Sequence, residues 1–163
     1  ITRWMAKRTA ITSMNVGMFL IPVSALLMAC GNLLGNDVIT GMSNITLMMI
    51  LGIVVQALAE CFISPRYLEY FSFQAPKGEE GMYLGFSHLH SFLSSIFGFG
   101  IAGVLLTKYC PDPALFPTRE AWETASANAH YIWYYFAGIG LIAAIALLIF
   151  AKTTEFIDKK KKA

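Results

Sequence analysis

A single acidic residue lies inside one of the long apolar stretches of this sequence. Glu60 follows the run ILGIVVQALA, and Gln56 and Ser64 lie four residues before and after it. Residues four apart share a face of an α-helix, so we predict that these three side chains point in one direction. A carboxyl group in that setting can carry a proton when it is partly desolvated, or bind the ammonium group of a solute in an open cavity. The alternative is that Glu60 lies near a helix end and merely reaches water.

Polar residues also gather near the start of a second apolar stretch, where Ser87, His88 and Ser91 are candidates to line the same substrate and proton pathway as Glu60. His88 and His90 are two residues apart, which separates them by about 200° around a helix. We therefore predict that they do not grip one metal ion. Each histidine could instead donate an interhelical hydrogen bond, the interpretation we favour, or relay a proton.

Recognisable catalytic and cofactor motifs are absent from the sequence. It contains no Gly-rich phosphate loop, no GxSxG elbow and no HExxH zinc motif. The three cysteines have neither metal-site spacing nor the pattern of a disulfide framework. We predict that the protein is not an enzyme and holds no cofactor or metal, with a membrane enzyme that uses His88 or His90 as an alternative.

The composition is that of a membrane protein. Of 163 residues, 56% are hydrophobic and only 13% are charged, against about 25% in soluble domains. Four stretches carry no charge, and each exceeds the ~20 residues that a helix needs to cross a bilayer; they are residues 9–36, 38–59, 81–107 and 124–151. The predicted fold class is therefore all-α, one polytopic membrane segment over residues 1–163, with four transmembrane helices at about 12–34, 43–63, 82–107 and 130–151.

The positively charged residues predict the orientation. Ten of the 12 Lys and Arg residues precede the first span, lie between the second and third, or follow the fourth. The positive-inside rule then places both termini and a loop at 64–80 in the cytoplasm, and a loop at 108–129 outside. We expect the membrane to be a plasma or bacterial inner membrane. The net charge is only +2 and the positive charges form no basic face. We therefore expect membrane lipid, and not nucleic acid, as a partner.

The connections and the small residues predict further details of packing. Residues 35–41 are predicted to form a short turn, and the proline-rich outside loop to open a short amphipathic helix near Thr118. Pro22 is predicted to kink the first span. Small residues recur at helical spacing in the third span, at Ser87, Ser91, Ser95, Gly98 and Ala102. Such a face allows a neighbouring helix to approach closely, so we expect partner helices beyond these four.

The stretch 60–76, ECFISPRYLEYFSFQAP, resembles the tenth helix and following loop of the proton-dependent oligopeptide transporters, a branch of the major facilitator superfamily. In that family a glutamate is followed four residues later by a serine, then by a Leu-Glu-Phe/Tyr step and a Gln-Ala-Pro turn. These elements appear here, in register and without a gap, as Glu60, Ser64, Leu68-Glu69-Tyr70 and Gln74-Ala75-Pro76. The sequence departs from the family pattern at Ala59, which replaces a glycine, at Ser87, which replaces a tryptophan, and at Ser94-Ser95 and Glu79-Glu80.

The resemblance implies that the four spans are helices nine to twelve of a secondary transporter, whose two six-helix halves rock about a midplane site. It implies that Glu60 receives the amino terminus of the substrate, that Ser64 lines the cavity and that Glu69 is a gate or loop carboxylate. The function expected from it is proton-coupled symport of di- and tripeptides or a related small solute, with the remaining helices of the transporter as partners.

Two other functions stay open. The chain could belong to a major facilitator transporter of a non-peptide solute, since the departures concern residues around the site. It could also be a stand-alone four-helix adaptor or assembly subunit, in which Glu60 reaches water and the small-residue faces join copies. The first residue is isoleucine, which fits a processed or partial product.

Overall fold

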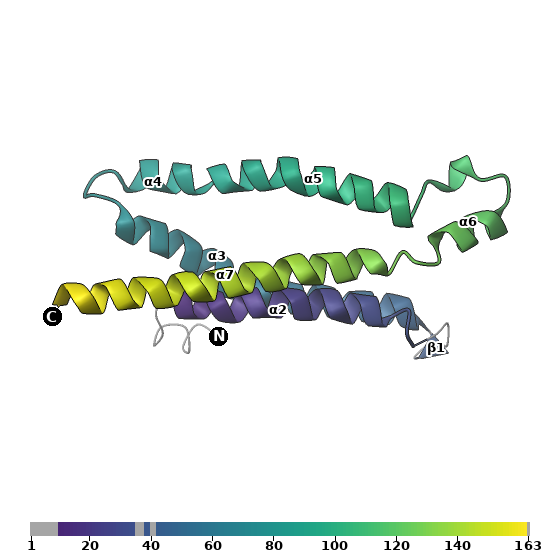
Figure 1. The fold of residues 1–163 in the computed structure, drawn as a ribbon, viewed down its shortest axis with the longest axis horizontal. Helices are drawn as coiled ribbons and strands as arrows, with labels where there is room; N and C mark the ends of the chain where they lie inside the picture. The colour runs from purple at the N-terminus through teal and green to yellow at the C-terminus, as the bar shows by residue number, and fades with distance from the viewer. Residues whose placement is uncertain (1–9, 35–37, 40–41, 163) are drawn as a thin grey trace.

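The computed structural model describes residues 10–34, 38–39 and 42–162, and nearly all of these are helical (Figure 1). Four helical segments of this part of the chain are long and apolar enough to cross a membrane. They contain α2 (Ala10–Cys30), α3 (Asn44–Gln74), α4 (Glu80–Ser87) with α5 (Leu89–Tyr109), and α7 (Tyr131–Lys162). The predicted all-α fold with four transmembrane helices is confirmed.

Helix α3 differs from the expected second span because it continues well past residue 63. It begins after Ser43, whose side chain accepts a hydrogen bond from the Thr46 N–H, and runs through Pro65 to Gln74. A proline removes only one backbone donor, and a membrane helix continues when the rest of its hydrogen-bond ladder is kept. Residues 64–74, predicted as the start of a loop, are thus helical, and the connection to α4 shrinks to a turn with Gly78 at φ 90°.

Helix α7 also extends beyond its predicted end at residue 151 and runs to Lys162. Neither Gly nor Pro follows Ala151 in the sequence, so no residue there breaks the helix. Between α2 and α3 lies the one pair of strands in the described residues, where β1 (Val38–Ile39) pairs antiparallel with β2 (Met42–Ser43). Residues 35–37 and 40–41 of the turn predicted there lie outside the described residues.

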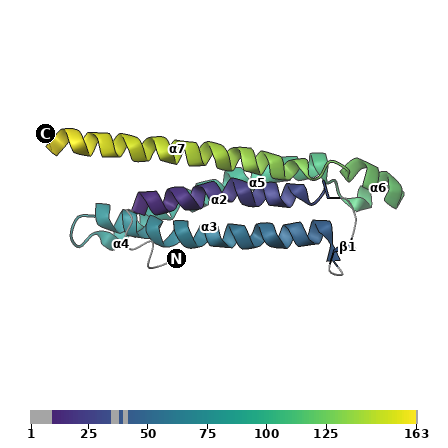
Figure 2. The ribbon, with the colours of Figure 1, turned by 90° about the horizontal axis from the view of Figure 1, so that it is seen from below.

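Helix α2 lies between α3 and α7, and small residues allow the three helices to approach closely (Figure 2). A Cβ added to Gly17 would lie 2.8 Å from the Ala59 carbonyl oxygen, and one added to Gly52 would lie 2.9 Å from the Ser24 carbonyl oxygen. On the other side of α2, Gly140 of α7 packs against Pro22. Because such contacts require the absence of a side chain, the glycines fix the spacing of this core.

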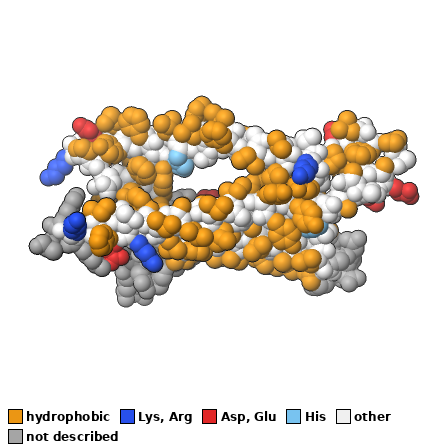
Figure 3. All heavy atoms as spheres, in the orientation of Figure 1, with side chains coloured by type: hydrophobic (Ala, Val, Ile, Leu, Met, Phe, Trp, Pro, Cys, Tyr) orange, Lys and Arg blue, Asp and Glu red, His pale blue; other side chains and the backbone are white. Residues whose placement is uncertain are grey.

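Helices α4 and α5 run in line with each other as an arm beside this core (Figure 1). Apolar side chains are exposed along the whole of α5, among them Leu89, Phe92, Leu93, Ile96, Phe97 and Phe99, and Figure 3 shows such side chains over both layers of this face. Lipid or further helices are the surroundings that suit a surface of this kind. Gly98 is one of the small residues predicted to form a packing face. A Cβ added to it would meet no atom within 4 Å, so no described helix packs against it.

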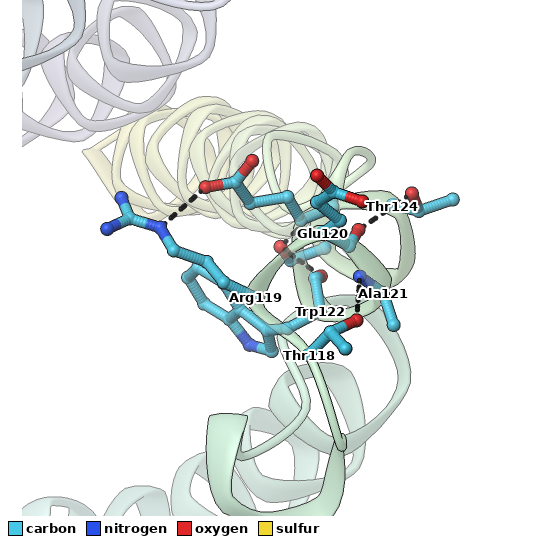
Figure 4. Close-up of polar contacts among 8 residues, drawn as sticks. Thr118, Arg119, Glu120, Ala121, Trp122 and Thr124 are labelled. Atoms are coloured by element: carbon cyan, nitrogen blue, oxygen red, sulfur yellow. Dashed lines mark hydrogen bonds and ion pairs between the residues drawn. The ribbon is translucent and has the colours of Figure 1, made fainter.

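A short helix, α6 (Arg119–Ser126), precedes α7, as the sequence predicted. The Thr118 side chain accepts a hydrogen bond from the Ala121 N–H at 3.3 Å, which caps the helix (Figure 4). On the next turn, Arg119 donates to Glu123 at 2.8 Å. The Trp122 indole N–H donates to the Pro111 carbonyl oxygen at 2.8 Å and so ties α6 to the chain that follows α5.

Candidate functional site

A pocket of about 380 Å³ lies where α3 faces the junction of α4 and α5. Four of the residues predicted from the sequence line it, namely Glu60, Ser64, His88 and Ser91, and the others are Ile63, Tyr67, Leu68 and His90. Its volume lies within the range of about 300–1,000 Å³ that is usual for small-molecule sites. The pocket therefore combines a carboxylate, hydroxyl groups and imidazoles with an apolar wall.

Glu60 points to the pocket because the residue before it is held in the helical core. Ala59 is fully buried beside Gly17 of α2, and the next residue on α3 is turned by about 100° around the axis. The Ser64 hydroxyl donates a hydrogen bond to Glu60 Oε2 at 3.2 Å. In the described residues no basic side chain forms an ion pair with Glu60. The carboxylate thus keeps acceptor capacity for a cationic group of a solute.

The helix on the opposite side of the pocket is interrupted at His88, where a single span was predicted. The Ser91 N–H donates to the His88 carbonyl oxygen at 3.0 Å, and the His88 N–H donates to the Gly85 carbonyl oxygen at 3.1 Å. These tighter bonds between residues three apart leave the Ser87 carbonyl oxygen without its usual backbone donor at Ser91. No proline marks this position, so the hydrophobic pattern gave no sign of the break.

The carbonyl oxygen of Ser87 is bound from α3 instead. The Tyr67 hydroxyl donates to it at 2.9 Å and also lies 2.9 Å from His90 Nδ1. The two rings are tilted, with centroids 4.8 Å apart. His90 therefore takes part in an interhelical hydrogen bond, one of the roles considered for the histidines.

The tautomer of His90 decides which of its neighbours it donates to. Nδ1 also lies within hydrogen-bonding distance of the Ser87 carbonyl oxygen, which can only accept, so this contact is a hydrogen bond when Nδ1 carries the hydrogen of the neutral ring. The other nitrogen, Nε2, is then an acceptor, and its neighbour is the Ser91 hydroxyl at 3.4 Å. His90, Ser91 and Tyr67 all line the pocket.

Three predicted site residues are not among the residues that line the pocket. Gln56 is exposed on α3, one turn before Glu60, and is not among the lining residues. Ser87 is buried, and its hydroxyl donates to the Leu84 carbonyl oxygen at 2.7 Å. Its contribution to this region is its backbone carbonyl. Glu69 lies on α3 and not in a loop, and it forms an ion pair with Arg66 on the same helix; its role at a gate stays a prediction.

Tyr67 is a polar lining residue that the sequence interpretation missed. It lies three residues after Ser64 and seven after Glu60, which places all three on one face of a helix. That spacing could have identified it if α3 had been extended past Pro65. The contact between Tyr67 and His90 joins residues 23 apart in the chain, and helical periodicity carries no information about such a pair.

Most of the chain matches a known protein family. The family model of the POT family (PTR2) matches residues 1–114, which include α2, α3, α4, α5 and every residue of the pocket. Comparisons with curated proteins and with solved structures give no match. The family match covers well over half of the 163 residues and agrees with the Glu60 to Pro76 motif and with four membrane-length helices. The chain belongs to the POT family of proton-dependent oligopeptide transporters, whose members are integral membrane transporters and not enzymes.

Proposed function

We propose that this chain supplies helices nine to twelve of a proton-coupled symporter of di- and tripeptides, and that Glu60 binds the amino terminus of the substrate. The observation that carries the proposal is the carboxylate of Glu60, which lines the pocket with no cationic partner in the described residues. An intramembrane carboxylate is costly unless a cationic group or water satisfies it. The ammonium group of a peptide supplies the missing charge.

The neighbours of Glu60 support this role. Ser64 donates to one carboxylate oxygen and so holds the group in one orientation, while the second oxygen can accept from an ammonium group. Ile63 and Leu68 give the pocket an apolar wall against which the substrate can lie. We propose in addition that Glu60 lies on the proton pathway, because an ionisable side chain within a membrane-spanning helix is by default a candidate for proton or substrate transfer.

The arrangement of the helices agrees with transport by alternating access. In such transporters the substrate site lies between helices that move as units, near the middle of the membrane. Here the pocket lies between α3, which is packed in the core with α2 and α7, and the arm formed by α4 and α5. The proposed topology places both ends of the chain and the turn between α3 and α4 in the cytoplasm, following the distribution of Lys and Arg.

The proposal is tested by uptake of a labelled dipeptide into vesicles that contain the complete transporter, driven by an inward proton gradient. Glu60→Gln keeps the size and shape of the side chain and removes its charge. Loss of one charge-assisted hydrogen bond weakens dipeptide binding by about 10- to 100-fold. Glu120→Gln on the exposed surface of α6 is the matched control, because it removes a carboxylate far from the pocket in sequence and fold.

N-acetylated dipeptide separates a direct contact from an indirect effect. The parent protein should bind it less tightly than the free dipeptide, whereas Glu60→Gln should bind both with similar affinity. If Glu60→Gln retains the affinity, the preference for a free amino group and the pH dependence of the parent, the proposed role of Glu60 is wrong.

A further inference from the structure

Four tyrosines line a second pocket where the end of α5 meets the start of α7 (Figure 1). Tyr109 is the last residue of α5, and Tyr131, Tyr134 and Tyr135 belong to the first turns of α7. The volume of this pocket is about 450 Å³. Because two membrane-length helices end here, we expect the pocket to lie at the level of the lipid head groups, where tyrosine is common.

The tyrosine rings meet at angles and are not stacked. The ring centroids of Tyr109 and Tyr131 are 5.9 Å apart with an angle of 80° between the planes, and those of Tyr131 and Tyr134 are 6.2 Å apart at 45°. The hydroxyl groups of Tyr109 and Tyr135 lie 3.1 Å apart, so a hydrogen bond joins α5 to α7. The three tyrosines of α7 remain exposed. The face of an aromatic ring attracts cations, so this pocket suits an ammonium group.

Lys108 places a positive charge at the edge of the tyrosine pocket. Its Nζ lies 4.9 Å from the centroid of the Tyr109 ring. No acidic side chain of the described residues forms an ion pair with it, and the carboxylate nearest in sequence, Asp112, accepts from the Ala114 N–H at 2.9 Å. The amine can therefore donate to a phosphate, and a bound phosphate offsets the repulsion between Lys108 and an ammonium group on the rings.

The face of α7 that continues from the tyrosines suits a hydrocarbon chain. Tyr131, Tyr135, Gly138, Ile142 and Ile145 follow one another at spacings of four and three, so they share one face of the helix. Ile142 is 70% exposed, and a Cβ added to Gly138 would meet no atom within 4 Å. The glycine leaves room on the helix surface directly beside the pocket. An acyl chain attached to a head group in the pocket can lie along this face.

We propose that the tyrosine pocket and Lys108 bind a membrane phospholipid whose head group carries an ammonium group beside its phosphate. The ammonium group lies against the faces of the tyrosine rings, Lys108 donates to the phosphate, and an acyl chain follows the exposed face of α7. Charge complementarity favours this occupant, because the same head group presents one cation to the rings and one anion to the amine. The bound lipid contacts α5 and α7 together and so connects the arm to the core. Neither Glu60 nor a peptide is needed for this interaction.

The test measures dissociation constants of phosphatidylcholine and phosphatidylglycerol with identical acyl chains, by native mass spectrometry of the complete transporter in a neutral detergent. Both lipids contain the phosphate, and only phosphatidylcholine contains the ammonium group. The parent protein should bind phosphatidylcholine about 2- to 30-fold more tightly. Tyr131→Leu should lose this preference and bind phosphatidylglycerol like the parent, whereas Tyr131→Phe keeps the ring face and should keep the preference. Lys108→Gln should weaken the binding of both lipids by about 2- to 5-fold.

Trp133→Leu is the matched control, because Trp133 belongs to the same turns of α7 but lines a different, apolar pocket with Phe136. It should keep the preference for phosphatidylcholine. If Trp133→Leu and Tyr131→Leu reduce lipid binding equally, the tyrosines form only a general aromatic belt and the proposal is wrong. Equal affinity of the parent for the two lipids also contradicts it. Displacement of phosphatidylcholine by an equal concentration of glycerophosphocholine, which has no acyl chain, would identify a soluble ligand and overturn the assignment to a lipid.

Discussion

The contact between α2 and α3 at Gly17 provides a direct test of how the core positions the pocket. A Cβ at this position would lie 2.6 Å from Ile63 Cγ1 and 2.8 Å from the Ala59 carbonyl oxygen. The first contact involves a β-branched side chain with few alternative rotamers, and the second involves backbone that cannot move alone. Gly17→Ala therefore forces α2 and α3 apart.

The magnitude follows from a comparison with a glycine in open space. Overpacking a close contact costs about 1–3 kcal/mol, while replacing a helical glycine by alanine returns about 1 kcal/mol. Gly81→Ala in the first turn of α4 gains the same helix propensity, and its Cβ would meet no atom within 4 Å. The difference between the two variants then isolates the steric cost, which is about 1–3 kcal/mol.

Thermal unfolding of the purified complete transporter measures this difference. With ~2–4 °C of shift per kcal/mol, Gly17→Ala should unfold about 2–12 °C below Gly81→Ala. Because Ala59 is adjacent to Glu60 in the sequence, the displaced helix should also bind dipeptide more weakly, whereas Gly81→Ala should bind it like the parent. An unfolding temperature for Gly17→Ala equal to or above that of Gly81→Ala would refute the close packing of α2 on α3.

Two other predictions concern the connections between the helices. Thr118→Ala removes the N-cap of α6 and should cost about 0.5–2 kcal/mol of local stability. The amides of residues 119–123 should therefore exchange hydrogen faster in Thr118→Ala than in Thr118→Ser, which keeps a capping hydroxyl. Equal exchange in the two variants would mean that the cap contributes nothing. Single cysteines at Lys77 and Arg119, placed in a cysteine-free background, should react with an impermeant maleimide from the cytoplasmic and the outer side respectively, because the positive-inside rule orients the chain that way. Labelling of both from one side would contradict the proposed topology.

The sequence predicted the architecture where a single physical rule decides it. Gaps between charges located all four membrane helices, and Thr118 marked the start of α6 because its side chain caps the helix. Helix α3 extends past the predicted span at residue 63 because that span followed the uncharged apolar stretch, whereas the helix continues beyond it and a proline inside a membrane helix leaves most of the hydrogen-bond ladder intact. The length of α7 was underestimated because its last turns extend beyond the apolar stretch.

The candidate site likewise contains residues that the sequence predicted and a feature that it could not predict. Glu60 and Ser64 were identified by a spacing of four, and the hydrogen bond between them is local to one helix. The break at His88 could not be predicted, because the bond that compensates for it comes from Tyr67, 20 residues earlier in the chain than Ser87. A periodic pattern describes which residues share a face, whereas a tertiary hydrogen bond depends on how two helices are docked.

The two faces of α3 therefore have different physical tasks. One face carries Gly52 and Ala59, and packs on α2 so closely that no larger side chain fits at Gly17. The other face carries Glu60 and Tyr67, which line the pocket. The Tyr67 hydroxyl donates a hydrogen bond to the Ser87 carbonyl oxygen and so connects α3 to the arm formed by α4 and α5. A tight apolar contact resists sliding because interiors are close-packed, while one directional hydrogen bond, worth about 1 kcal/mol net, can break and re-form. We therefore expect movement between α3 and the arm to disrupt fewer close-packed contacts than movement within the core of α2, α3 and α7.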